Sequence, residues 1–429
     1  MHLLGTGIKH SGLNLSTITS LSDFKTLRLK PIYFKEEWLV GFGWDENNIF
    51  PFNQSGNRPT AADLDLYFPD KPVAFTRADG HALWLNTLAL KKLGYFQNVN
   101  LNDPKGGVIV RDQLGSPSGL FLEEAKINID IQLPDYTSEN KIVFIDSAIK
   151  HFNKSGFTHV RDMSCDLFLW DYLKKLDLKN RLTLFYEGNF TVEGIQDLDR
   201  CFRDLNTAKQ DSLHRMRVRG AKVFYDGSLG SETALLSQNY ENRIHNGIKI
   251  WTDEEIKQVL HFFWEKEIEV SFHTIGDQAV YNIANQAVLI KRSGLNGTIN
   301  FEHVELINPQ TIPLLKELNA TCYLQPCHWL SDKTWVDKKI APLKHYLFRW
   351  KELETQNIRF FWGSDSPIEE PSVFSNQMAL FDAEKSGIPK TKFFEVYHSH
   401  PDPQWGNNTF SEFENKMIKQ VFIEGTTLT

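Results

Sequence analysis

The sequence has few cysteines, and their spacing argues against a disulfide scaffold or a cysteine-based metal site. Only four occur in 429 residues, none of them in a Cys-x-x-Cys pair, and a chain of this length does not need disulfides for its stability. These features indicate a reducing compartment, and we expect the protein in the cytoplasm. The four are Cys165, Cys201, Cys322 and Cys327.

Long apolar runs and an excess of positive charge are also missing. No stretch of about 18 uncharged apolar residues occurs, and the N-terminus lacks a basic segment followed by an apolar one. The sequence therefore predicts neither a membrane-spanning protein nor an exported one. With 47 Lys and Arg against 54 Asp and Glu, the net charge of −7 disfavours nucleic acid and anionic membranes as partners.

What is present is a globular composition with alternating strand-like and helical segments. Seven short segments rich in β-branched or aromatic residues alternate with helical patterns, which is typical of an α/β fold with a parallel sheet. If residues 1–4, MHLL, end a further strand, the eight strands close a (β/α)8 barrel of the TIM type. The seven predicted strands are 158–163, 182–187, 218–226, 269–277, 299–305, 321–326 and 358–365.

Residues 31–130 differ in composition from the remainder of the predicted barrel. They are rich in glycine, asparagine and proline, with one strand-like and one helix-like segment. We interpret them as a large insertion after the first strand that folds over the rim of the barrel. The predicted division is therefore a barrel over residues 1–385 and a separate C-terminal segment over 386–429.

Four reactive side chains fall at or near the ends of predicted strands: Lys222, His273, His303 and Asp365. In a (β/α)8 barrel these strand ends meet on one rim, where catalytic groups lie. Imidazole nitrogen and carboxylate oxygen together suit Zn²⁺ or a similar divalent ion. A lysine buried beside cations has a lowered pKa, and its neutral amine can react with CO2 to give a carbamate that bridges two metal ions.

Several long motifs occur in the same order as in a known family. They are PTAADLDLYFPDKPVAFTRADGHALWLNTLAL, GAKVFYDGSLGSETALL, HTIGDQAV and GSDSPIEEP. On these motifs the sequence resembles the amidohydrolase superfamily, in the branch similar to N-substituted formamide deformylases. The resemblance extends over roughly residues 1–385.

The resemblance implies a metal-dependent hydrolase with one or two divalent ions, zinc being the expected metal. Its pattern places the metal ligands at five positions of this chain. They are His2, Lys222 as a carbamate, His273, His303 and Asp365. The implied reaction is cleavage of a non-peptide carbon–nitrogen bond in a small amide, such as an N-substituted formamide. Metal-activated hydroxide would attack, with Asp365 as general base.

Two departures from the family pattern affect this expectation. The first strand of the family carries a His-x-His pair, of which only the second histidine, His2, is present here. A companion β-sandwich is mostly missing, and we interpret residues 386–429 as its remnant. The alternatives are therefore a truncated, catalytically impaired or inactive barrel that acts only in binding, or a metal-free binding module. A short first strand leaves strand edges open, so self-association into a homo-oligomer remains open as well.

Four more residues are candidates for contact with a substrate. Asp79 and His81 lie in the predicted insertion, where Asp79 is equally well explained as the cap of the following helix. Trp44 is either a pocket residue or a buried anchor of the insertion. His328 follows a strand end and lies near the predicted rim.

Overall fold

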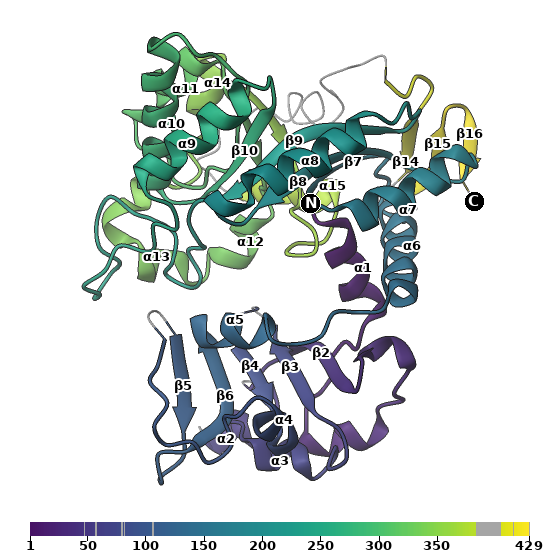
Figure 1. Cartoon of the computed structure of the whole chain (residues 1–429), viewed down its shortest axis with the longest axis vertical. Coiled ribbons are helices and arrows are strands. Elements are labelled where there is room, and N and C mark those ends of the chain that lie inside the picture. Colours follow the sequence, from purple (N-terminus) through teal and green to yellow (C-terminus); the bar gives the residue numbers. More distant parts are fainter. Residues whose placement is uncertain are drawn as a thin grey trace. The chain divides into compact units, whose positions relative to one another are not determined.

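The computed structural model describes residues 1–429 except 47, 56–57, 79, 81, 105–106, 383–404, 415 and 429. The chain divides into two compact units (Figure 1). The C-terminal unit comprises Met1–Leu3 and Ile149–Thr429, and the N-terminal unit comprises Leu4–Ala148. The predicted insertion, residues 31–130, lies within the N-terminal unit, and the described residues after Asp382 belong to the same unit as the seven predicted strands.

A seven-stranded parallel sheet forms the centre of the C-terminal unit. Its strands follow one another in chain order, and each pairs in parallel with the next. All seven predicted strands are therefore confirmed, which establishes the α/β class. The strands are β7 (His159–Cys165), β8 (Phe185–Val192), β9 (Met216–Phe224), β10 (Glu269–Thr274), β11 (Ile299–His303), β12 (Thr321–Leu324) and β13 (Arg359–Trp362).

Helices connect the successive strands, as parallel pairing requires. In α9 a Thr252–Glu255 capping box starts the helix, and a stripe that includes Ile256 and Val259 buries its apolar face. None of the helices in the described part of the chain is long and apolar enough to cross a membrane. The main connecting helices are α7 (Leu167–Leu178), α8 (Leu198–Lys209), α9 (Asp253–Trp264), α10 (Asp277–Arg292), α11 (Thr311–Leu318), α12 (His328–Asp332), α13 (Val336–Lys339) and α14 (Trp350–Thr355); α15 (Val373–Asp382) follows β13.

The first two residues contact both end regions of the sheet. The amide of Met163 in β7 donates to the Met1 carbonyl at 2.8 Å, and the amide of His2 donates to the carbonyl of Ser366 at 2.7 Å. The prediction that residues 1–4 all belong to a strand is wrong, because α1 (Leu3–Ser11) begins directly after His2. The Asp162 carboxylate accepts from the Leu3 amide at 3.1 Å and satisfies one of the free donors that a helix start presents.

The N-terminal unit is built on a six-stranded sheet in the order β1-β2-β3-β4-β6-β5 (Figure 1). Only β2 and β3 pair in parallel. The strands are β1 (Phe34–Lys35), β2 (Trp38–Trp44), β3 (Val73–Arg77), β4 (Ala82–Leu85), β5 (Gly107–Arg111) and β6 (Pro117–Glu123). The helices are α2 (Phe52–Ser55), α3 (Ala61–Asp65), α4 (Thr87–Lys92) and α5 (Glu124–Asp130), while α1 and α6 (Ser138–Lys154) contain the unit boundaries.

Trp44 lies in the core of the N-terminal unit. Its indole nitrogen donates to the Phe75 carbonyl at 2.7 Å, and its ring packs edge-on against Trp84 at 5.2 Å. The side chain is completely buried. This geometry matches the interpretation of Trp44 as a buried anchor, and it leaves the indole no exposed surface for a substrate.

The C-terminal segment adds a small antiparallel sheet of β14 (Phe410–Glu414), β15 (Met417–Ile423) and β16 (Thr426–Leu428). Together with Trp405, this sheet packs against the first residue of β8. The rings of Trp405 and Phe185 are 5.0 Å apart and edge-on, and the Trp405 indole donates to the His214 carbonyl. Val421 and Ile423 complete this apolar cluster. The contact explains why the segment belongs to the C-terminal unit.

We expect Trp405→Ala to lower the free energy of unfolding of the C-terminal unit by about 3 kcal/mol, as for other large-to-small substitutions of buried aromatic residues. Chemical denaturation monitored by circular dichroism measures this loss. Phe410→Ala is the matched control, because Phe410 is 48% exposed. The control should cost less than about 1 kcal/mol. Equal losses in the two variants would contradict the anchoring role of Trp405.

Candidate metal centre

The carboxyl ends of neighbouring parallel strands carry four of the predicted site residues. Lys222 lies two residues before the end of β9, and His273 lies one residue before the end of β10. His303 is the last residue of β11, and Asp365 follows β13 by three residues. All four belong to the C-terminal unit, as does His2. Parallel strands bring these ends to the same edge of a sheet.

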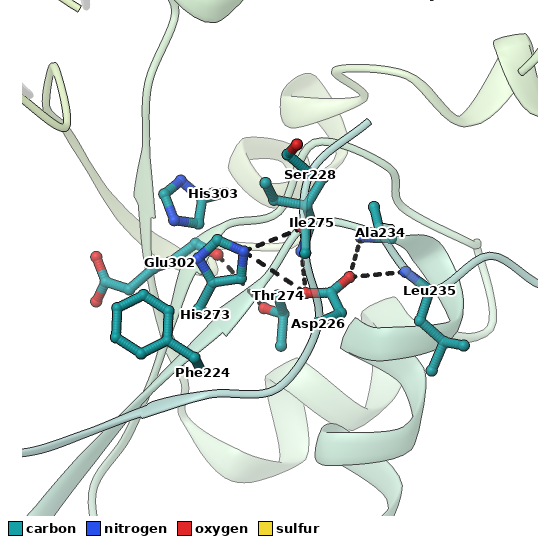
Figure 2. A network of polar contacts seen from close by, with 12 residues as sticks. Phe224, Asp226, Ser228, Ala234, Leu235, His273, Thr274, Ile275, Glu302 and His303 are labelled. Atoms are coloured by element: carbon teal, nitrogen blue, oxygen red, sulfur yellow. Dashed lines mark hydrogen bonds and ion pairs between the residues drawn. The ribbon is translucent and has the colours of Figure 1, made fainter. Parts of the chain in front are cut away.

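His273 and His303 form the centre of the site (Figure 2). Their ring centroids are 4.4 Å apart. Burial lowers the pKa of His303 to about 3. Burial, together with His303 and Lys222, holds the pKa of His273 well below its ordinary value. Both imidazoles are therefore neutral near pH 7, and each carries one nitrogen lone pair.

The hydrogen bonds of the two imidazoles show which nitrogen carries the proton. His273 donates from Nε2 to the carbonyl of Gly227 at 3.1 Å. The Gln325 amide nitrogen donates to the Tyr323 carbonyl, so its oxygen faces His303 and accepts from Nδ1 at 2.9 Å. The lone pairs of His273 Nδ1 and His303 Nε2 make no hydrogen bond within the described part of the chain. Each is thus available to a ligand.

Lys222 lies in the same buried region. Its side chain is 1% exposed, and its Nζ lies 4.9 Å from the centroid of the Phe224 ring. Burial is the main cause that lowers the pKa of Lys222, to about 8. A minor fraction of this amine is therefore neutral near physiological pH, more than for an exposed lysine, and a neutral amine is nucleophilic.

Asp365, which follows β13, is an ionised carboxylate. Its Oδ1 lies 3.5 Å from Nε2 of His2, whose Nδ1 lies 3.0 Å from the Ser164 hydroxyl. Burial alone would raise the pKa of Asp365. The hydrogen bond from His2 is the largest of the interactions that outweigh burial and hold the pKa of Asp365 well below its ordinary value. The site therefore brings together all five residues that the family resemblance implied as ligands.

Asp226, which the sequence analysis did not single out, joins the loops around His273 (Figure 2). Its carboxylate accepts from the backbone amides of Leu235, Ile275 and Gly276 at 2.9–3.1 Å. Its Oδ1 also lies 3.8 Å from His273 Nε2. Its place four residues after Lys222, in YDG, was the available signal for a loop residue close to the site.

His328, one of the residues considered for substrate contact, lies beside the site. Its Nδ1 is 2.7 Å from Glu305 Oε1, and its ring is stacked on that of His303 with centroids 5.9 Å apart. Burial alone would lower the pKa of His328, but the hydrogen bond and charge of Glu305 raise it to about 9. The sequence analysis missed Glu305, for which the His-x-Glu spacing from His303 was the signal. Asp79 and His81 lie outside the described residues.

The donor set fits a divalent metal ion of the zinc type. Two neutral imidazoles with free lone pairs lie beside a buried amine and an ionised carboxylate, and a further imidazole, that of His2, contacts the carboxylate. Nitrogen and oxygen donors in this combination suit Zn²⁺ and similar ions. The metal-ligating atoms of His303, Glu305 and His328 also lie within 4.8 Å of one another.

Comparison with known proteins assigns most of the chain, including all seven parallel strands and the N-terminal unit, to one family. The sequence profile described as the Amidohydrolase family matches residues 1–391. The YtcJ protein of Bacillus subtilis (strain 168), whose name places it among the amidohydrolases, is 30% identical over 388 residues. The aligned region covers 86% of this chain and 69% of YtcJ.

Two further similarities concern a named enzyme and a solved structure. The N-substituted formamide deformylase of Arthrobacter pascens is 21% identical over 281 residues, which are 62% of this chain and 49% of the deformylase. An uncharacterized metal-dependent hydrolase from Pyrococcus furiosus has a TM-score of 0.70 and 24% identity, over 92% of this chain and 79% of that one. At this identity the structural likeness shows the fold alone.

We expect Asp226→Ala to lower the free energy of unfolding by at least about 2 kcal/mol, because three buried amides lose their acceptor. Thermal and chemical denaturation measure the loss. Asp171→Ala, on the exposed side of α7, is the matched control and should stay within about 0.5 kcal/mol of the wild type. An unfolding free energy of Asp226→Ala equal to that of the wild type would show that the two loops do not depend on this carboxylate.

Proposed function

Since the chain belongs to the amidohydrolase family, we propose that it is a metal-dependent hydrolase of small molecules. The proposed bond is a non-peptide carbon–nitrogen bond in an amide, such as that of an N-substituted formamide. The observation that carries the proposal is the pair of neutral imidazoles, His273 and His303, beside the ionised Asp365. The similarity to the formamide deformylase supports this choice of substrate class.

The fold supports the proposal through the position of the site. We propose that the seven-stranded sheet is the barrel of a (β/α)8 fold, with Met1 and His2 in the position of its first strand. The backbone hydrogen bonds of these two residues to Met163 and Ser366 support this arrangement. His2 then faces the site from the strand position that carries metal ligands in this family.

We propose that His2, His273, His303, Asp365 and a carbamate on Lys222 hold one or two divalent ions, with zinc as the expected metal. A bound ion supplies Lewis-acid polarisation of the substrate carbonyl and a lower pKa for water at the site. The neutral amine of Lys222 forms the carbamate by adding to the carbon of CO2, and the nitrogen then releases one proton. Burial of Lys222 favours this reaction, because it raises the neutral fraction of the amine.

Asp365 is the proposed general base. It takes a proton from the attacking water and delivers it to the nitrogen of the leaving amine. Its lowered pKa keeps it ionised before the reaction, and the contact with His2 orients its carboxylate.

The four cysteines are free and buried, which supports the proposed cytoplasmic location of this activity.

We expect Asp365→Asn to reduce kcat on a panel of N-substituted formamides by at least about 100-fold, the usual effect of losing a general acid–base group. Steady-state assays by amine release measure the change. Asp337→Asn, at an exposed ion pair with Lys344, is the control and should retain the wild-type rate. Wild-type turnover in Asp365→Asn would exclude Asp365 as the base.

We expect the purified protein to contain a divalent metal, and His273→Ala to lose most of it. Elemental analysis measures metal per chain, and circular dichroism checks that the variant is folded. Hydrolysis lost on treatment with a chelator and restored by Zn²⁺ would agree with the proposal. A wild-type protein that binds no divalent ion would favour the alternative, a barrel that acts only in binding.

A further inference from the structure

His328 occupies a position beside the site that none of the proposed steps explains. It is the first residue of α12, four residues after β12 ends at Leu324. The side chain is 9% exposed, and the Glu305 side chain that contacts it is 4% exposed. A short hydrogen bond of 2.7 Å joins its Nδ1 to Glu305 Oε1.

The other ring nitrogen of His328 has no partner. Nε2 is buried and makes no hydrogen bond within the described part of the chain. Buried polar atoms are nearly always paired, so an unpaired one indicates a missing water, ion or ligand. The ring of His303 is stacked on that of His328, with the centroids 5.9 Å apart and an angle of 19° between the ring planes.

The contact with Glu305 resembles the support that metal-binding imidazoles receive in proteins. Such a histidine donates its distal N–H to a carboxylate, which orients the ring and increases the basicity of the nitrogen that faces the metal. Glu305 holds His328 in this manner. One possible ligand atom from each of His303, Glu305 and His328 lies within 4.8 Å of the other two, so these three residues are close enough to surround an ion.

We propose that His328 is a further ligand of the metal centre, through Nε2, and that Glu305 is its positioning residue. The inference rests on the proposed function, because it adds a ligand to the ion that His303 holds. It goes beyond the family pattern, which takes no ligand from this position. Binding of the ion replaces any proton on Nε2, and that proton passes to solvent.

A purely structural ion pair is the competing explanation. In that case His328 and Glu305 stabilise the loop after β12, and their loss changes stability but not the ligand environment of a bound ion. Spectroscopy of the ion separates the two explanations, because visible bands of Co²⁺ respond to the number and type of ligands. This measurement does not require a substrate.

The test replaces the native metal with Co²⁺ in the full chain. We expect His328→Gln to shift the visible Co²⁺ bands and to weaken Co²⁺ binding roughly 10- to 100-fold or more. Glu305→Gln should weaken binding in the same direction with a smaller spectral change, because the imidazole remains. His261→Gln is the matched control, since His261 is an exposed histidine 3.9 Å from a glutamate, Glu265. It should keep the wild-type spectrum and affinity.

The outcomes separate this inference from the proposed function. If His328→Gln binds Co²⁺ with the wild-type spectrum and affinity, His328 is not a ligand, and the proposed hydrolase remains. If the wild type binds no divalent ion, the proposed metal centre fails and the inference fails with it. Should His328→Gln not fold, anomalous diffraction from the wild-type Co²⁺ protein decides. An ion about 2.1 Å from Nε2 supports the proposal, and one well beyond bonding distance overturns it.

Discussion

The three backbone amides held by the Asp226 carboxylate are the contact on which the geometry of the site depends. They tie the loop after β9 to the loop after β10, so the carbonyl of Gly227 lies where His273 can donate to it. That single bond places the proton on Nε2 and leaves the Nδ1 lone pair free. The side-chain amide of Gln325 fixes the proton position of the adjacent His303 in the same way, because its oxygen accepts from Nδ1. Polar groups in the surrounding loops thus determine the chemistry of both imidazoles.

Burial then assigns a different charge to each group in the site. It keeps His273 and His303 neutral and brings the pKa of Lys222 down to about 8. Asp365 is held as an ion, because the hydrogen bond from His2 and its other neighbours outweigh the cost of burial. Arg161 of β7 pairs with Glu302 of β11 at 2.7 Å, so this buried charge pair is compensated. The site thus combines an amine of lowered pKa, two imidazole lone pairs and a proton acceptor.

Local patterns in the sequence predicted the parallel strands of the C-terminal unit and the residues that end them. Seven strands and the strand-end positions of His273, His303 and Asp365 followed from local patterns, and the family resemblance is confirmed by the profile match. Residues 3 and 4 were wrongly included in a strand, because the helix-starting contact from Asp162 lies about 160 residues away. Asp226 and Glu305 were missed for the same reason. In the sequence, a buried acidic residue in a loop cannot be told from an exposed one, because the groups that bind it are distant along the chain.

The sequence by itself determined which chemical groups end the parallel strands, since strand periodicity and residue order are local properties of the chain. Only the tertiary structure decided their states: which imidazole nitrogen is free, which amine is partly neutral, and which carboxylate stays ionised. These states depend on burial and on contacts such as those of His2 with Asp365 and of Glu305 with His328. Residues distant in sequence make those contacts, and their energies follow from distance and desolvation, which the order of residues does not encode.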